Sequence, residues 1–230
     1  GQAGLVLGGT FADLPYARSE DMPLGALRFD PAAGLFGLVP ARSDGPAADL
    51  ELRRLLAQAI DRQALVDALD VPGLLPRATV LEPGLDGLAD PAPPAWSAIP
   101  VAERRAELAA AAGAQLGELE RPVLRIALPD GPGSDVLLGR LAADWGVLGI
   151  QVERAGRGAA ADLLLVDAVA PSTSPVWYLR RFQCGEAPVC AEEVNPLLEA
   201  ARAALAPAEQ SLLLAQAADL QLLSPTVMQP

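Results

Sequence analysis

The chain has 230 residues, 51% of them hydrophobic, which is enough for one large domain or two small ones with a substantial core. It carries 17 basic and 29 acidic residues for a net charge of −12, and every basic residue is Arg. Without His or Lys there is no His base, His metal ligand, Lys Schiff base or phosphate-loop Lys, and the acidic charge argues against nucleic acid as a partner. Ala and Leu form more than a third of the chain and aromatics only 4%, which favours a helix-rich α/β or α+β domain.

The first part of the chain is predicted to combine short strands with one long helix. Apolar runs bounded by turn residues predict strands at 5–7, 26–29 and 35–39. Apolar residues at helical spacing then predict a helix that begins at the N-cap Asp49 and ends at Pro72-Gly73.

The next stretch, 72–100, holds seven of the 22 prolines and is predicted to be irregular, of the kind that is functional or crosses a surface. Beyond it the apolar patterns predict a helix at 101–112, a strand at 123–128, a helix at 136–148, strands at 150–153 and 163–166, and helices at 192–205 and 208–223. The run 163–166 is continuously apolar, as in a buried parallel strand. This order is typical of an α/β layer. No apolar run reaches 18 residues, which argues against a membrane-spanning helix.

The turn after the strand at 123–128 approaches two functional motifs and completes neither. Gly131-Pro132-Gly133 suggests a dinucleotide-binding loop, but Val136 stands where a third Gly is required, and Pro132 has no amide for a phosphate. Ser134 fails the nucleophile-elbow pattern at the same Val136, and no His is present to act as its base. We interpret the segment as an ordinary strand-to-helix turn.

Three residues are candidate ligand contacts: Asp167, Trp177 and Tyr178. Asp167 directly follows the predicted strand at 163–166, so its carboxylate is expected at the sheet edge where open α/β sheets bind ligands. It either meets a cationic group of a ligand there or serves as an N-cap or turn residue. Trp177 and Tyr178 follow a turn rich in Pro, Ser and Thr. They either face a ligand as an aromatic pair or pack on the core at a helix start.

The two cysteines, Cys184 and Cys190, enclose a short loop with turn-forming residues. Two cysteines are too few for a zinc site and are compatible with one disulfide or with two thiols. A disulfide is expected in an oxidising compartment, and two inert thiols are expected in the cytosol.

Several segments match, in order, the motifs of one protein family. The most specific match joins residues 49–53 and 59–66 to the pattern D-x-x-x-R … A-I-D-R-x-x-[LIV]-V. Looser matches are residues 1–6 to G-x-x-D-[LIV], 102–113 to a helix ending in A-G, 148–152 to L-G-[IV]-x-[VL], 164–171 to W-x-x-D-Y-x-x-P, and 195–203 to N-P-x-x-D-x-L. Together these segments resemble the family 5 extracytoplasmic solute-binding proteins of ABC transporters, the peptide, nickel and opine group. The sequence departs from the pattern at Leu164 and Ala168, which replace the Trp and Tyr beside Asp167.

The resemblance implies that residues 1–230 form the inserted lobe of a two-lobe receptor, an α/β fold with a mixed sheet flanked by helices. Its implied role is to capture a small-molecule or peptide ligand for import, with the missing second lobe and an ABC permease as partners. A periplasmic or extracytoplasmic location follows, in which Cys184 and Cys190 are bonded. An inserted lobe also implies that Gly1 and Pro230 lie close together. We expect a monomer with no catalytic residue, no metal and no cofactor.

Two other functions stay open from the sequence. One is an interaction or scaffold domain that reuses the fold without a small-molecule ligand, which the replaced aromatics beside Asp167 would suit. The other is an enzyme of an unrecognised α/β class, against which the absence of His and Lys and the incomplete glycine motif argue.

Overall fold

A mixed five-stranded sheet organises the protein, as seen in a computed structural model that describes residues 8–19, 23, 25–29, 32–116, 122–222 and 226–228. The strands are β1 (Gly34–Pro40), β2 (Val123–Ala127), β3 (Gln151–Arg154), β4 (Leu163–Val169) and β5 (Thr226–Met228), in the order β3-β2-β4-β1-β5. β2 runs parallel to β3 and β4, whereas β1 runs antiparallel to β4 and β5. The predicted strand at 5–7 and the two ends, Gly1 and Pro230, lie outside the described residues.

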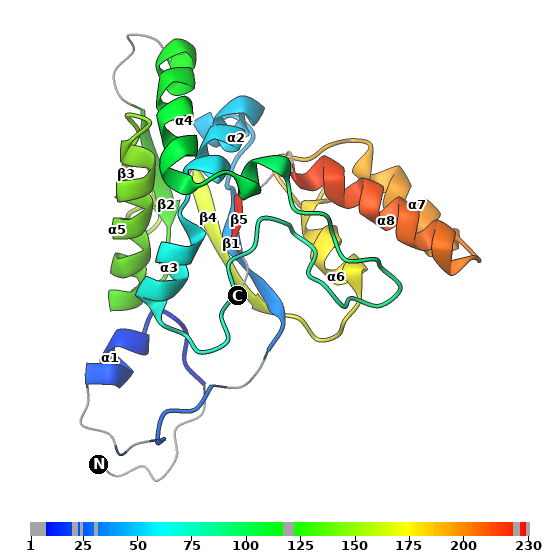
Figure 1. Ribbon diagram of the computed structural model, residues 1–230, viewed down its shortest axis with the longest axis horizontal. Coiled ribbons are helices and arrows are strands. Elements are labelled where there is room, and N and C mark those ends of the chain that lie inside the picture. Colours follow the sequence, from blue (N-terminus) through cyan, green and yellow to red (C-terminus); the bar gives the residue numbers. More distant parts are fainter. Residues whose placement is uncertain are drawn as a thin grey trace.

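Helices cover both faces of this sheet (Figure 1). They are α1 (Leu14–Ser19), α2 (Leu50–Ala59), α3 (Arg62–Leu69), α4 (Val101–Leu116), α5 (Pro132–Gly146), α6 (Pro175–Leu179), α7 (Val194–Ala203) and α8 (Pro207–Leu222). Short 3₁₀ turns lie at Pro46–Ala48, Ala95–Ala98 and Arg180–Phe182. The predicted α/β fold, a mixed sheet flanked by helices, is confirmed. Among the described residues, no helix combines the length and apolar character needed to cross a membrane.

The side chains of β1 alternate between two hydrophobic cores, one on each face of the sheet. Phe36 and Leu38 pack in a first core with buried residues of α2, α3, α4 and α5. Leu35 and Val39 pack instead in a second core with α6, α7 and α8. Because successive side chains of a strand point to opposite faces, this one strand joins both cores.

The single helix predicted from Asp49 to residue 71 is wrong, because the chain forms two helices there. Asp49 caps α2 as predicted, its side chain accepting the Leu52 amide at 2.7 Å. However, α2 ends at Ala59, where Ile60 turns to an extended backbone. Asp61 then caps α3 by accepting the Ala64 amide at 3.0 Å. A side-chain oxygen placed to satisfy the first amides of a new helix favours a break there that the apolar spacing does not reveal.

The strand predicted at 26–29 is also wrong. These residues form no strand and pair with no neighbour in the sheet. Leu27 and Phe29 instead line a cavity, so these apolar side chains form part of the cavity wall and not of the sheet. β5 was not predicted, since three residues are too few for a strand pattern to stand out.

The proline-rich stretch at 72–100 is irregular, as predicted, and runs across the molecule from one core to the other (Figure 1). Its first part, Leu74, packs on the first core, while Val80, Leu81 and Leu85 are buried in the second. Near its end the ring of Trp96 lies under two guanidinium groups of the helices, each 5.1 Å from the ring centroid. The stretch therefore ties the two faces together.

The C-terminal end of α2 is held by four side chains. The last four carbonyls of a helix have no partner within the helix. Here the carbonyls of residues 56–59 each accept a side-chain hydrogen bond from a different residue outside α2. The donors, in order, are Trp145 at 3.0 Å, Arg62 at 2.8 Å, Arg104 at 2.6 Å and Arg105 at 3.1 Å. Because these donors belong to α5, α3 and α4, the end of α2 fixes three neighbouring helices at once.

A buried carboxylate completes this arrangement. Asp144, 1% exposed, accepts the Asp61 amide at 3.0 Å and pairs with Arg105, and Arg140 approaches it at 3.7 Å. Burial raises the pKa of the Asp144 carboxyl, while the Asp61 amide and the two guanidinium groups oppose that rise. Arg105 thus serves both the end of α2 and the buried acid.

Replacing Arg105 should therefore be costly. We expect Arg105→Leu to lower the free energy of unfolding by about 3 kcal/mol, because it leaves Asp144 without its main cation and Ala59 without its donor. The matched control is Arg54→Leu, which removes only an exposed pair with Glu51 on α2 and should cost less than about 1 kcal/mol. Urea unfolding of both variants tests this, and equal losses would contradict the assigned role.

Candidate functional site

A cavity of about 700 Å³ opens to solvent beside the first core. It lies between the N-terminal segment, β1, β4 and the end of α3. Its lining residues are Gly8, Gly9, Thr10, Phe11, Asp13, Leu14, Tyr16, Ala17, Leu27, Arg28, Phe29, Phe36, Leu69, Val71, Leu74 and Asp167. We refer to this space as the Asp167 cavity. Its wall is mostly apolar with a few polar groups, which is the usual character of a small-molecule site.

Two glycines at the start of α5 allow the N-terminal wall of the cavity to pack closely against that helix. The Gly133 amide donates to the Ala12 carbonyl at 2.8 Å, and a Cβ at Gly133 would lie 2.0 Å from the Phe11 carbonyl oxygen. Gly131 has a φ of +138°, a conformation that side chains rarely adopt. The Gly131-Pro132-Gly133 turn thus admits a close backbone approach, which gives its glycines a structural reason. Phe11, held in this way, meets the ring of Phe36 edge-on at 4.9 Å.

Asp167 lies inside a strand, which corrects two parts of the prediction. β4 continues to Val169, so Asp167 pairs with Phe36 of β1 and does not follow the strand. The prediction of a buried parallel strand holds only in part. β4 pairs parallel with β2 at Leu163 and Leu164, but it runs antiparallel to β1 along its whole length, and its Leu164 is 40% exposed. The apolar run stops at Val166, but the pairing with β1 extends the strand through the acidic residue. The length of a strand depends on hydrogen bonds to its partner strand, so it can extend beyond the apolar run in its own sequence.

Among the described residues, none forms a hydrogen bond or an ion pair with the carboxylate of Asp167. Although Asp167 is exposed to solvent, the protein atoms packed around it desolvate the carboxyl and raise its pKa. An unpaired acid in a mostly apolar cavity suits a ligand that brings a positive charge.

Trp177 and Tyr178 lie elsewhere, on α6 and on the other face of the sheet. Tyr178 is fully buried and donates to the carboxylate of Glu82; burial first, and then Glu82, raise the pKa of its hydroxyl. The Trp177 ring packs edge-on against it at 4.9 Å, with Arg181 over its face at 5.0 Å. Neither residue lines the Asp167 cavity, so the structure does not bring the three candidates together. A ligand contact for Trp177 and Tyr178 stays a prediction.

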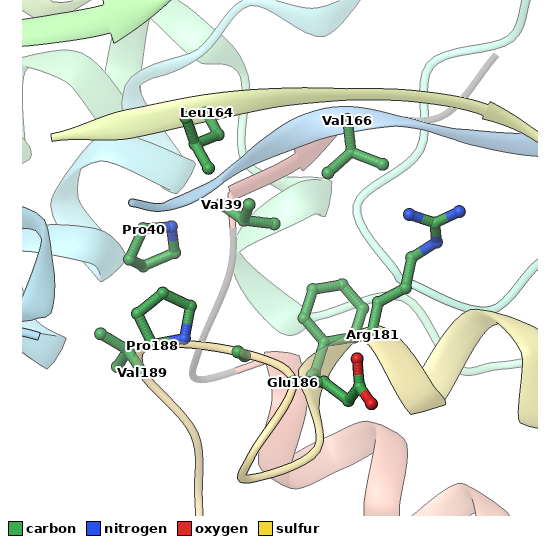
Figure 2. A pocket seen from close by; sticks show the side chains of 10 residues that line it. Val39, Pro40, Leu164, Val166, Arg181, Glu186, Pro188 and Val189 are labelled. Atoms are coloured by element: carbon green, nitrogen blue, oxygen red, sulfur yellow. The ribbon is translucent and has the colours of Figure 1, made fainter. Parts of the chain in front are cut away.

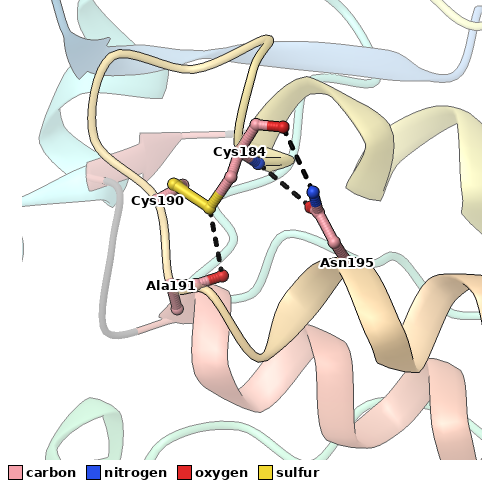
Figure 3. Close-up of a disulfide and its surroundings, with 4 residues drawn as sticks. All are labelled: Cys184, Cys190, Ala191 and Asn195. Carbon is pink, nitrogen blue, oxygen red and sulfur yellow. Dashed lines mark hydrogen bonds between the residues drawn. A yellow bond between two sulfur atoms is a disulfide. The ribbon is translucent and has the colours of Figure 1, made fainter.

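Cys184 and Cys190 form a disulfide, with Cα atoms 5.2 Å apart, as predicted for an oxidising compartment. Asn195 at the start of α7 holds the same loop from the other side (Figure 3). Its Oδ1 accepts the Cys184 amide at 3.0 Å, and its Nδ2 donates to the Cys184 carbonyl at 3.2 Å. The loop is therefore attached to α7 by contacts that do not depend on the disulfide.

The disulfide loop covers a second, smaller cavity of about 230 Å³ (Figure 2). Its roof comes from residues 186–189, and its floor from Val39, Pro40, Leu164 and Val166 of the sheet. Because Leu164 and Val166 alternate with Asp167 along β4, this cavity lies on the opposite face from the Asp167 cavity. The two cavities are therefore separate sites.

Sequence reasoning missed most of the cavity wall. Phe11, Tyr16, Phe29 and Phe36 all line it, and none was singled out. A signal was present, because these four aromatics fall within the first 36 residues of a chain that has only 4% aromatic residues. Arg28 and Asp13 were likewise missed, since isolated charges in a loop give no pattern.

Comparisons with known proteins give a likeness of fold. No protein-family profile and no curated protein sequence matches the chain. Among solved structures, the murein tripeptide-binding protein MppA of Escherichia coli matches 86% of this chain at a TM-score of 0.76 and 16% identity. OppA of Burkholderia pseudomallei matches 86% at 0.71 and 20% identity. A substrate-binding protein of Microbacterium hydrocarbonoxydans, in complex with 4-hydroxybenzoate hydrazide, matches 94% at 0.63 and 19% identity.

The chain spans less than half the length of each of these proteins, at 43%, 44% and 48% respectively. The part that matches nonetheless covers most of this chain. The chain therefore has the fold of one portion of the periplasmic peptide- and substrate-binding proteins, as the resemblance implied.

Substitution of two glycines of α5 tests the close approach of the N-terminal segment to this helix. Gly133→Ala should lower the free energy of unfolding by about 1–3 kcal/mol, because its methyl group would overlap the Phe11 carbonyl. Gly139→Ala is the matched control: no atom lies within 4 Å of its new Cβ, and helix propensity should stabilise it by about 0.5–1 kcal/mol. Urea unfolding measures both, and a stabilised Gly133→Ala variant would contradict the close approach.

The disulfide is expected to stabilise the chain by about 2 kcal/mol, since it closes a short loop in the unfolded state. Urea unfolding with and without reductant should show this difference in the unaltered chain. The double variant Cys184→Ser/Cys190→Ser should match the reduced chain and show no effect of reductant. Alkylation before reduction should label neither cysteine; two labelled thiols in material from an oxidising compartment would overturn the assignment.

Proposed function

We propose that this chain is the ligand-binding lobe of a two-lobe extracytoplasmic receptor that captures a solute, of the peptide type, for an ABC importer. The observation that carries the proposal is the Asp167 cavity, whose carboxylate has no partner among the described residues. It lies on a fold that matches less than half the length of periplasmic peptide-binding proteins. The role is capture and not catalysis, in keeping with neighbours that are binding proteins.

The shape of the cavity supports capture between two surfaces. A volume of about 700 Å³ suits a small-molecule ligand. The cavity is open to solvent, and one of its lining residues, Tyr16, is 63% exposed. A second lobe closing over this opening would exclude water and strengthen every charge contact inside. The partners we propose are therefore a second lobe and the permease, with the receptor itself monomeric and placed in the periplasm or outside the cell.

Asp167 is the residue proposed to bind the ligand's positive charge. A charge-assisted hydrogen bond from an ammonium group would supply the partner that the carboxylate lacks among the described residues. The affinity should then depend on pH in a defined direction. As the pH falls through the raised pKa of Asp167, protonation removes its charge, and a cationic ligand should bind more weakly.

Asp167→Asn separates this role from a structural one. A carboxyl whose pKa is raised by folding weakens the folded state once the pH exceeds the pKa of an ordinary aspartate. We therefore expect Asp167→Asn to be more stable than the unaltered chain at neutral pH, and the difference to vanish in acid below that ordinary pKa. A structural turn or capping role predicts the opposite, a loss of stability in the Asn variant. Thermal unfolding across pH distinguishes the two.

The receptor role itself is tested on the complete protein purified from its own host. Native mass spectrometry should find a retained small molecule or peptide, and Asp167→Asn should lose it or hold much less of it. The control is Leu205→Ala, at an exposed position on the turn between α7 and α8, and this variant should retain the ligand. No retained ligand and no affinity for cationic peptides by calorimetry would refute the proposal.

A further inference from the structure

Aromatic side chains are concentrated at the Asp167 cavity. Three of the four Phe residues of the chain and one of its two Tyr residues line this one cavity. Only Phe36 among them is deeply buried in the first core. Tyr16 is exposed and Phe29 is half-buried, so packing of the core does not account for their positions.

The register of β1 and β4 makes Phe36 and Asp167 neighbours in the sheet. The two residues are directly paired across β1 and β4, which places their Cβ atoms about 4.5–5.5 Å apart on the same face. Phe11 meets Phe36 edge-on at 4.9 Å, a geometry that another ring can extend. An aromatic surface and a carboxylate that is unpaired within the described part of the chain therefore lie side by side in the cavity.

We propose that the ligand of the Asp167 cavity presents an aromatic ring next to a cationic group, as in an arylalkylamine or a peptide with an aromatic first residue. This inference rests on the proposed function and adds the chemical class of the captured group. The ring packs against Phe11, Phe29 and Phe36, and the ammonium group binds Asp167. Tyr16 borders the same space from α1.

The charges of the cavity favour a cation over an anion. Two carboxylates, Asp13 and Asp167, line it together with one guanidinium group, Arg28. Asp13 accepts a hydrogen bond from Thr10 at 3.3 Å, whereas Asp167 has no such partner among the described residues, so we assign the ligand's cation to Asp167. The chain as a whole carries a charge of −12, which also attracts cations and repels anions.

The test uses this chain and small probes, followed by NMR titration at millimolar concentrations because the cavity is open. The probes are 2-phenylethylamine, butylamine and phenylacetate. We expect 2-phenylethylamine to bind about three- to tenfold more tightly than butylamine, the advantage of one aromatic contact. Phenylacetate should bind more weakly than 2-phenylethylamine, because its charge is opposite.

Two variants locate the aromatic contact without removing core residues. Phe29→Leu and Tyr16→Leu keep an apolar side chain but remove a ring, and each should reduce the preference for 2-phenylethylamine over butylamine. Leu205→Ala, exposed on the turn between α7 and α8, should leave the preference unchanged.

The outcomes separate this inference from the proposed function. Equal binding of the two amines, weakened by Asp167→Asn, would keep the cation site and overturn the aromatic class. A tighter 2-phenylethylamine complex that Asp167→Asn leaves unchanged would overturn the pairing of ring and charge. Failure of both amines to bind overturns the inference, whereas the receptor role is decided by the ligand retained in the complete protein.

Discussion

The carbonyl end of α2 is the constraint on which the first face of the molecule depends. Four carbonyls that a helix cannot satisfy itself are each met by a side chain from another helix. Leaving such groups buried and unpaired would cost more than the bonds themselves supply, so the positions of α3, α4 and α5 are fixed together. The position of one cavity wall is therefore fixed as well, because that wall is formed by residues at and after the end of α3: Leu69, Val71 and Leu74.

A second constraint, the pairing of β1 with β4, turns this scaffold into a site. The alternation of β1 divides the apolar side chains between two cores, and its register sets Phe36 opposite Asp167. Gly133 then lets the N-terminal segment approach α5 closely enough to bring Phe11 against Phe36. Backbone contacts thus bring together three residues that are distant in the sequence. Asp167 lies opposite Phe36, which meets Phe11, and its carboxylate has no partner among the described residues.

Local patterns predicted the elements well where one pattern acted alone. The helix predicted at 136–148 forms as α5, which buries Leu137, Leu141 and Trp145. The strands at 35–39 and 123–128 appear with small shifts of boundary. The helix from Asp49 was wrong where a second cap, Asp61, competed with the apolar period. Asp167 was misplaced because a partner strand, not its own sequence, extends β4. The cavity itself was beyond prediction, since its wall depends on contacts between residues 11, 36 and 167.

Asp167 carries a carboxylate that has no partner among the described residues and is open to a cation. The most direct test is its carboxyl pKa, measured by NMR in the free chain and again with saturating 2-phenylethylamine. We expect a pKa above that of an ordinary aspartate in the free chain, since the surrounding protein desolvates the group, and a lower pKa when the ammonium is bound. An ordinary pKa that the amine does not move would contradict it.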